Sequence, residues 1–476
     1  MRENWLHKLD SRPFLRNFSL LTVGNFSSRF ISMIINIIVA RFLAPERYGE
    51  YSLVLTYISM FYFVASLGLS QLVTRSVARE QDHSAYYFRL SLVLRGWGFI
   101  VSAVAFALYA FFTHQEFSSF VIFSILGGVF LESLWDAEQN VAFGMQRMEW
   151  NTVIGISATL LNLVIYLLMP RSWFTVESVL AVYLGVYVLK TVTYYVCLKH
   201  FSLLRGDGGQ KHISFQESQD YLKQAMPFYL MYLLSLFTGQ FPILFLEHNT
   251  GVVEVAYFNT ANKLLLPITL FMQTAFSAFF PNQSILFARD RAAFSLQTRK
   301  VLALVCGLGV YMAISASLFK GELVALLYGA DYANTANVLA YQCWYTVLYG
   351  IFCLNGNTLG AADAQGKLAV CSVIYALVST PILYFSSRRG AEGLAAGFVL
   401  ASILNLLYIF PVLKKTVGGA MTWKFSGLLL AVVFASIAFS LFAIDALSLP
   451  WRIALFFALS MGIFAGRKTF VKVWKE

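Results

Sequence analysis

Hydrophobic residues recur along the chain in runs of about twenty, separated by short polar connections. A transmembrane helix needs about 20 mainly apolar residues to cross a hydrocarbon core of roughly 30 Å. The runs therefore predict about fourteen membrane-spanning helices. We place them at 18–41, 52–71, 88–113, 119–141, 151–169, 177–198, 222–246, 256–279, 300–319, 336–358, 368–387, 393–413, 425–444 and 450–466.

The composition supports an all-α polytopic membrane protein. Of the 476 residues, 58% are hydrophobic and only 12% are charged, whereas soluble domains are about 45–50% apolar and roughly 25% charged. These values exclude a soluble globular enzyme, a disordered chain and a secreted disulfide scaffold. The connections are also too short to hold a separate soluble domain of about 50 residues or more.

Lysine and arginine residues predict the orientation. If the N-terminus lies inside, the inner connections hold roughly three times as many of these cations as the outer ones, as the positive-inside rule requires. We therefore expect both termini to be cytoplasmic. The same asymmetry accounts for the net charge of +11 without a nucleic-acid partner.

The longest polar connection, 199–221, is glycine-rich and divides the chain into six helices before it and eight after it. Two halves of equal orientation indicate a parallel repeat, and ARFLAPERYGEYSLVL after the first helix is weakly echoed by LFLEHNTGVVEVAYFNTA after the seventh. The expected organisation is an N-terminal cytoplasmic tail (1–17), an N-lobe (18–198), a cytoplasmic linker (199–221), a C-lobe (222–413), and two further helices with a cytoplasmic C-terminal tail (414–476).

The first predicted helix carries a polar stripe. Thr22, Asn25, Arg29, Ser32 and Asn36 are spaced three and four residues apart, which places them on one face. An arginine in mid-membrane costs about 2.5–3.5 kcal/mol on insertion scales, so Arg29 is not expected to face lipid. The stripe is either a polar packing seam or a cationic contact to a wet lumen, and we select Arg29, Asn25 and Asn36 as candidate substrate-binding residues.

The eighth predicted helix, 256–279, carries a second stripe. Asn259 and Asn262 lie on it, Lys263 lies at its flank, and Pro267 is expected to kink the helix one turn further on. Lys263 faces a lumen or extends its ammonium group to the membrane interface, and both alternatives stay open. These three polar residues are the remaining candidates for substrate binding.

Acidic residues concentrate in the fourth predicted helix, 119–141. Glu132 and Asp136 share a face, while Glu138 lies off it. Arg95 in the third helix is expected at the same depth, so an ion pair of Arg95 with Asp136 or with Glu132 is predicted. Such a pair neutralises costly charges, or one of the acids is a protonatable group that couples or gates transport.

No motif for catalysis or for a cofactor is visible. The five cysteines and six histidines have no metal-ligand spacing, and no GxxxxGKS, GxSxG or DxD motif occurs. We therefore expect no catalytic residues, no metal and no cofactor. Because all outer connections are short, a membrane enzyme of sugar-lipid assembly is disfavoured.

Three segments carry a family resemblance. ARFLAPERYGEYSLV looks like an R-x-L-x-P-x-x-Y-G-x-Y turn, and VAYFNTANKLLLPITLFMQTAFSAFFPNQS and NTLGAADAQGK match two further segments. In these the chain resembles the Wzx-type polysaccharide flippases of the multidrug/oligosaccharidyl-lipid/polysaccharide exporter superfamily. The resemblance implies two six-helix lobes around a central cavity plus two C-terminal helices.

The resemblance also implies a function. Such flippases move undecaprenyl-pyrophosphate-linked oligosaccharide units from the cytoplasmic to the periplasmic leaflet of the bacterial inner membrane by alternating access. The product supplies surface polysaccharide such as the O-antigen of lipopolysaccharide. A proton or sodium gradient is the implied energy source, and a polysaccharide polymerase and a chain-length regulator are the implied partners. Arg29 stands where the family has a pyrophosphate-binding cation. The alternatives are a multidrug or other secondary exporter of the same superfamily, and a lipid II flippase.

Overall fold

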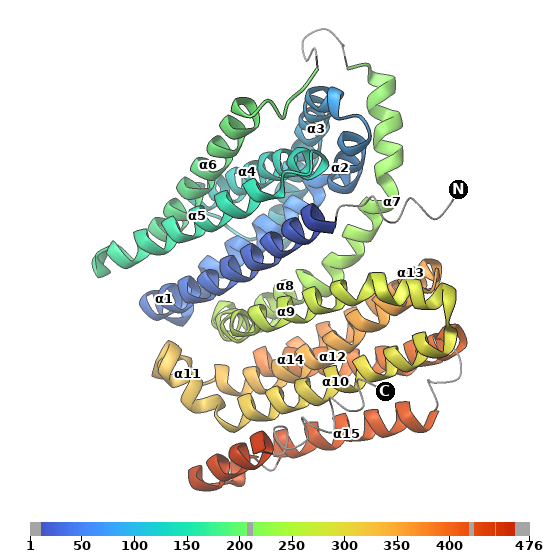
Figure 1. Ribbon diagram of the computed structural model, residues 1–476. Coiled ribbons are helices and arrows are strands. Elements are labelled where there is room, and N and C mark those ends of the chain that lie inside the picture. Colours follow the sequence, from blue (N-terminus) through green and yellow to red (C-terminus); the bar gives the residue numbers. More distant parts are fainter. Residues whose placement is uncertain (1–10, 207–212, 418–422, 443, 462–476) are drawn as a thin grey trace. The chain divides into compact units, whose positions relative to one another are not determined.

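The computed structural model describes residues 11–206, 213–417, 423–442 and 444–461, which are helical apart from short turns and contain no strand (Figure 1). Parts of the predicted tails and of the predicted linker therefore lie outside the described residues. The chain divides into two compact units, Met1–Ile243 and Leu244–Glu476.

The first unit is built from seven α-helices and two short 3₁₀ helices among its described residues. They are α1 (Ser11–Ser66), α2 (Leu69–Arg79), η1 (Gln81–His83), α3 (Ser84–Thr113), α4 (Ser119–Gly144), α5 (Met148–Leu168), η2 (Arg171–Trp173), α6 (Val176–His200) and α7 (Phe215–Gly239). Helix α1 packs against α3, α4 and α5, and α4 packs against α2 and α6.

The second unit contains the remaining helices, with α8 straddling the division between the two units. They are α8 (Phe241–Thr250), α9 (Val252–Arg289), α10 (Arg291–Leu318), α11 (Lys320–Tyr328), η3 (Ala330–Tyr332), α12 (Thr335–Ala361), α13 (Gln365–Ser387), α14 (Gly390–Val417), α15 (Trp423–Phe442), η4 (Ile444–Ala446) and a last described helix, Leu449–Met461. Helix α12 is central, because α9, α10 and α14 all pack against it.

Each predicted span overlaps helix in the described residues, although the spans 52–71 and 222–246 are each divided between two helices and the end of 450–466 lies outside the described residues. Nine helical segments of the described residues are long and apolar enough to cross a membrane. The first of these, Gly24–Ser66, holds two predicted spans. Helix α12 falls outside that criterion, and the described residues contain two shorter apolar helices, Ala431–Ser440 and Leu449–Met461. For α12 the reason is physical: it buries polar residues such as Gln342 and Asn355 inside the unit, where apolar character toward lipid is not required.

The prediction of a connection at 42–51 between the first two spans is wrong, because this segment is almost entirely helical. Residues 42–51 are helical except at Ala44, whose φ of 61° and ψ of 168° separate α1 into two helices. Pro45 disfavours helical backbone at the residue before it and is well suited to the first position of a new helix. Gly251, before α9, has a similar backbone (φ 92°, ψ 176°), so the weak sequence echo coincides with a common type of helix break.

One further expectation needs correction. The second span, predicted as continuous over 52–71, breaks at Leu67 and Gly68, which both have positive φ, and the chain continues as the separate helix α2. Between the predicted spans 300–319 and 336–358, where no helix was predicted, the chain forms α11. Gly68 has room for no side chain, because an added Cβ would overlap the backbone of Ala225 and Tyr229 in α7.

Helix α7 belongs to the first unit by its contacts. The hydroxyl group of Tyr221 donates a hydrogen bond to Ser76 Oγ over 3.0 Å, and α7 also packs beside Gly68. The contact division after Ile243 thus differs from the predicted linker at 199–221. The lobe boundaries drawn from the sequence stay a prediction about the repeat.

Candidate functional site

The stripe on α1 presents its first polar residues to the surface of the unit. Asn25 and Arg29 are exposed, beside the exposed rings of Phe26 and Phe30. Arg29 forms no hydrogen bond or ion pair with any residue that the structure describes. The side chain of Thr22, the first residue of the stripe, lies outside the described part of the structure. Arg29 is therefore a surface cation without an internal counter-charge among the described residues.

Asn36, at the other end of the stripe, is engaged within the unit. Its Oδ1 accepts a hydrogen bond from the Tyr48 hydroxyl over 2.8 Å, and its Nδ2 donates to the carbonyl oxygen of Ser32 over 2.8 Å. Asn36 is half-buried and Tyr48 is buried. This geometry favours the packing alternative for Asn36 and leaves the lumen alternative to Asn25 and Arg29.

The polar residues of the stripe on α9 lie in two different environments of the second unit, one buried and one at the surface. Asn259 is buried, with 6% of its surface exposed, whereas Asn262 is exposed and Lys263 is half-buried. The same helix uses the backbone carbonyl of Phe258 to accept a hydrogen bond from Gln342 of α12 over 3.0 Å. Asn262 and Lys263 thus remain at the unit's surface, while Asn259 faces the packed interior.

Helices α3 and α4 bring Arg95 and Asp136 together as an ion pair. Arg95 is 2% exposed and Asp136 is 15% exposed. The Ser70 hydroxyl donates to Asp136 Oδ2 over 2.5 Å, and Asn140 Nδ2 donates to the same oxygen over 3.1 Å. Arg95 Nε in turn donates to Ser91 Oγ over 3.1 Å. Of the two predicted pairings for Arg95, the structure has the one with Asp136.

Glu132 has other neighbours. It lies near the hydroxyl group of Tyr183 and within electrostatic reach of Lys190, both on α6. Lys190 lies within the predicted span 177–198, and no partner was predicted for it, although a charge in a span requires one. Glu138 was not among the predicted candidates, yet it is 3% exposed and also lies near Lys190. Lys190, a charged residue in a predicted span without a predicted partner, could have indicated its proximity to Glu132 and Glu138 from the sequence.

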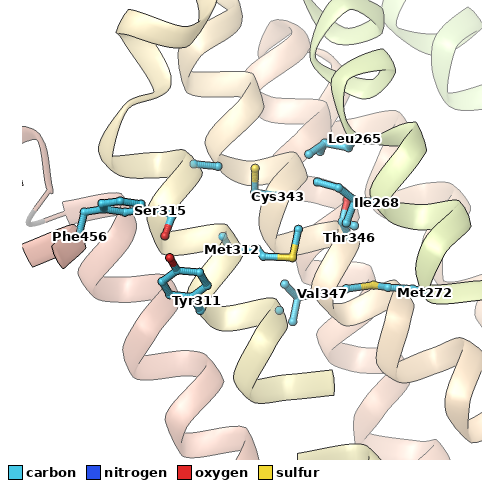
Figure 2. A pocket seen from close by; sticks show the side chains of 13 residues that line it. Leu265, Ile268, Met272, Tyr311, Met312, Ser315, Cys343, Thr346, Val347 and Phe456 are labelled. Carbon is cyan, nitrogen blue, oxygen red and sulfur yellow. The ribbon is translucent and has the colours of Figure 1, made fainter. Parts of the chain in front are cut away.

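A cavity of about 210 Å³ lies in the second unit among α9, α10, α12 and the last described helix (Figure 2). Its walls are mainly apolar, with Met272, Met312 and Val347 among the lining side chains. Tyr311, one of its few polar lining residues, shares a hydrogen bond of 2.8 Å with Ser460. No charged residue lines this cavity, so it is unsuited to a phosphate or a sugar.

Metal-ligating residues do not gather in the described residues, where no group of three or more His, Cys, Asp or Glu side chains is arranged to hold an ion. The five cysteines are free, and Cys306, Cys343 and Cys371 are buried. The candidate residues of the described chain therefore lie in the surface stripes on α1 and α9 and among the buried charges of α3, α4 and α6.

Residues 14–287 match the family model described as "Polysaccharide biosynthesis protein", which is more than half of the chain. The chain belongs to the polysaccharide biosynthesis protein family. One curated relative, the sporulation protein YkvU of Bacillus subtilis, is 21% identical over 210 residues, which are 42% of this chain and 46% of YkvU. The chain thus spans less than half the length of that relative.

Solved structures share the fold of this family member. The inward closed form of the lipid II flippase MurJ aligns with a TM-score of 0.63 at 15% identity, covering 94% of this chain and 99% of MurJ. An inward-facing multidrug resistance transporter of the MATE family, in the MOP superfamily, aligns with a TM-score of 0.64 at 17% identity, covering 82% and 96%. The protein is thus an all-α, multi-pass membrane protein with the fold of MOP-superfamily transporters.

A third structure bears on binding-site charge. It is a MOP-superfamily transporter from Pyrococcus furiosus, described as having a binding pocket of reversed polarity, which suggests a different function. It aligns with a TM-score of 0.55 at 14% identity, covering 84% of this chain and 96% of the other. The fold therefore does not determine the charge of the substrate, which has to be argued from this chain's own residues.

Proposed function

We propose that this protein flips undecaprenyl-pyrophosphate-linked oligosaccharide from the cytoplasmic to the periplasmic leaflet of the bacterial inner membrane, by alternating access. The observation that carries the proposal is Arg29, an exposed cation in the middle of a predicted span, without an internal partner among the described residues. Membership of the polysaccharide biosynthesis protein family supplies the context of the substrate.

The chemistry of the substrate fits these residues. A pyrophosphate carries at least two negative charges, and a guanidinium group binds phosphate oxygens through two parallel hydrogen bonds. Asn25, one turn before Arg29, offers an amide for sugar hydroxyls, and Lys263 and Asn262 offer a second cation and a second amide on α9. The lipid tail stays in the bilayer while the charged and sugar-bearing headgroup moves.

Two other functions are weighed against this one. A lipid II flippase would use the same pyrophosphate chemistry, and the fold shared with MurJ favours keeping it as a candidate. An exporter of cationic drugs requires acidic residues at the binding surface, but the exposed candidates on α1 and α9 are basic or neutral. The intramembrane acids Glu132, Asp136 and Glu138 lie instead inside the first unit.

The test is a flipping assay in proteoliposomes. The probes are an undecaprenyl-pyrophosphate disaccharide with a fluorescent label, lipid II with the same label, and a labelled phospholipid as control. A membrane-impermeant reductant bleaches only the outer leaflet, so the extent of bleaching measures translocation. Movement of the disaccharide lipid in excess of both other lipids is expected. Movement of lipid II alone would instead identify a lipid II flippase. Transport of a cationic dye without movement of any lipid would identify a drug exporter.

Three related expectations belong to the proposal. Both termini are cytoplasmic, and a polysaccharide polymerase with its chain-length regulator receives the flipped unit. Surface polysaccharide of the O-antigen, capsule or exopolysaccharide type is the end product.

A further inference from the structure

An aromatic ladder runs along one side of α12 in the second unit. The ladder consists of Tyr341, Tyr345, Tyr349 and Phe352. Their spacing of four, four and three residues places them on one side of the helix. All four are partly exposed, whereas Trp344 beside them is buried. The ring centroids of Tyr345 and Tyr349 are 6.0 Å apart, and those of Tyr349 and Phe352 are 6.5 Å apart. Around its centre, α12 therefore presents a row of rings on its accessible side.

Two neighbouring helices extend this surface. Tyr375 of α13 continues the ladder, because its ring centroid lies 5.9 Å from that of Phe352. Gln273 of α9 donates a hydrogen bond from Nε2 to the Tyr349 hydroxyl over 3.0 Å. Tyr375 is partly exposed and Gln273 is exposed. We call the surface formed by Tyr345, Tyr349, Phe352, Tyr375 and Gln273 the tyrosine platform.

The tyrosine platform lies far from the helix ends. Tyr345 and Tyr349 flank the centre of α12, which packs among the candidate spans α10, α13 and α14. Tyr375 lies next to the centre of α13. Tyrosines that contact lipid are enriched at the membrane interface, where the hydroxyl group reaches water, and a phenol or an amide facing hydrocarbon at the centre of a span loses those hydrogen bonds at a cost. The central tyrosines and the exposed Gln273 therefore indicate that the tyrosine platform faces a water-filled cavity.

The chemistry of the tyrosine platform is neutral. It contains no charged side chain, so it lacks the cation that a phosphate requires. Its hydroxyl and amide groups both donate and accept hydrogen bonds, as the hydroxyl groups of a sugar do. Its rings are flat apolar surfaces that fit the C–H faces of pyranose rings. The Tyr345 hydroxyl forms no hydrogen bond with the described residues, so it is available to a ligand.

Two other occupants fit the tyrosine platform less well. A prenyl or acyl chain has no hydrogen-bonding group for the tyrosine hydroxyls or for Gln273. An organic cation is bound by an acid or by rings that surround it, but the tyrosine platform has no acid and presents its rings in a row along α12. A chain of neutral sugar rings matches both the row of rings and the polar groups beside it.

We propose that the tyrosine platform binds the sugar rings of the lipid-linked oligosaccharide. Tyr345 and Tyr349 stack on sugar rings, while the Tyr345 hydroxyl and Gln273 bind sugar hydroxyl groups. This assignment deepens the proposed flippase function and rests on it for the identity of the substrate. Because the tyrosine platform is uncharged, the sugar and the pyrophosphate are recognised by different side chains, and a change in the platform alters the preference for the sugar alone.

Cys353 provides a native probe of the tyrosine platform. It lies one turn after Tyr349 on α12 and is partly exposed. Three of the other cysteines are buried, and Cys197 of the first unit is replaced by serine in every sample. A methanethiosulfonate reagent with a trimethylammonium group is added to purified full-length protein in lipid nanodiscs, and mass spectrometry follows the modification. This charged reagent acts from water, so Cys353 should be modified, and an unmodified Cys353 overturns the water-filled cavity at the platform.

Sugar binding is measured as protection of Cys353 from this reagent. Two lipids are compared, undecaprenyl pyrophosphate with a disaccharide and undecaprenyl pyrophosphate without sugar. The disaccharide lipid should slow the modification several-fold more than the sugar-free lipid. Y345L should lose this difference, because leucine has no flat ring, whereas Y345F should keep part of it. The control F385L removes a 61% exposed ring near the end of α13 and should behave like the wild type.

Three outcomes of the protection experiment overturn the proposal. Equal protection by both lipids would mean that the prenyl chain or the pyrophosphate covers the tyrosine platform. Protection by tetraphenylphosphonium, but not by the disaccharide lipid, would identify a site for organic cations. Sugar-dependent protection that Y345L retains in full would place the sugar elsewhere.

The flipping assay separates this inference from the proposed function. Y345L should move the disaccharide lipid about 10-fold more slowly than the wild type, normalised to folded protein, while F385L keeps the wild-type rate. A Y345L rate equal to that of the wild type overturns the role of the tyrosine platform in transport. If the wild type flips no lipid, the proposed function fails, yet the protection of Cys353 still decides whether the platform binds sugar. If the wild type flips the disaccharide lipid without sugar-dependent protection, the platform fails alone.

Discussion

The hydroxyl group of Tyr48 donates a hydrogen bond to the side-chain oxygen of Asn36 over 2.8 Å. The two residues lie on opposite sides of the break at Ala44, so this bond joins the two helices into which α1 is divided. Tyr48 is 1% exposed, and its hydroxyl group would lose a buried partner without Asn36. Tyr48, the first of the two tyrosines in the segment APERYGEY, is thus placed to fix the geometry of the break.

Y48F should therefore lower the free energy of unfolding by about 0.5–1.5 kcal/mol, the usual net contribution of a hydrogen bond. Reversible denaturant unfolding of the purified protein in detergent measures it. The matched control is Y51F, because Tyr51 is also buried but its hydroxyl group has no hydrogen bond in the described residues. Equal losses in the two variants would contradict the structural role of the Tyr48–Asn36 bond.

Two neighbouring glycines of α3 provide a second test. An added Cβ at Gly98 would overlap the carbonyl oxygen of Ala65, whereas one at Gly96 meets nothing within 4 Å. G98A should destabilise the protein by about 1–3 kcal/mol, because a backbone neighbour must shift. G96A should be neutral or stabilise by up to about 1 kcal/mol, since alanine favours helix. Thermal unfolding midpoints compare the two, and a G98A midpoint at or above that of G96A would refute this account of α1–α3 packing.

The sequence predicted the helices of the fold well because apolar runs of membrane length are strong signals. It missed the breaks. Pro45 predicts a helix start, but Ala44 and Leu67 have positive φ, which is uncommon for residues other than glycine, and no local pattern predicts it. Helix α11 was missed for a related reason: with nine residues it is too short to be recognised as a span.

The candidate sites were less predictable because residue spacing gives a helical face but not what covers it. Asn25 and Asn36 share a predicted face, yet the first is exposed and the second is bonded to Tyr48. Asn259 and Asn262 differ in the same way on α9. The Arg95–Asp136 pair was foreseeable, because two costly charges at one depth need each other. Glu138 was not, since its neighbours come from α6.

Removing one member of the Arg95–Asp136 pair should be harsher than removing both. D136N or R95Q alone is expected to lower stability by about 3–5 kcal/mol, because a buried charge loses its partner. The double variant should lose less than the sum of the two single changes. Unfolding in detergent and the yield of folded protein measure this. The exposed Arg147–Glu149 pair is the control, with an expected effect of about 0–1 kcal/mol. If the stability loss of the double variant equalled the sum of the two single losses, Arg95 and Asp136 would not be energetically coupled.

The predicted topology is tested with reporter fusions. A cytoplasmic reporter should be active when fused after residue 206 or 476, and a periplasmic reporter should be active after residue 249. The reason is the excess of Lys and Arg in the inner connections. Residue 249 lies near the end of α8, before the break at Gly251. A periplasmic signal from the fusion at residue 476 would contradict an even number of spans.

Arg29 gives the decisive test of the cationic lumen. It is exposed on α1 and forms no ion pair or hydrogen bond with the described residues, so its removal leaves no internal group unpaired. R29A should therefore insert and fold like the wild type while its flipping rate falls about 10- to 100-fold, which corresponds to the roughly 1.5–3 kcal/mol of a charged hydrogen bond. R29K should keep part of the activity, because the charge remains but the two-pronged phosphate contact is lost.

The control for Arg29 is R41A, which removes another exposed arginine of α1, near the predicted outer end of the helix. R41A should leave flipping unchanged. Translocation of the labelled disaccharide lipid, normalised to folded protein, separates these variants. Full activity of R29A would make Arg29 a residue of the packing seam, and equal loss in R29A and R41A would mean that general surface charge, rather than a phosphate contact on α1, supports transport.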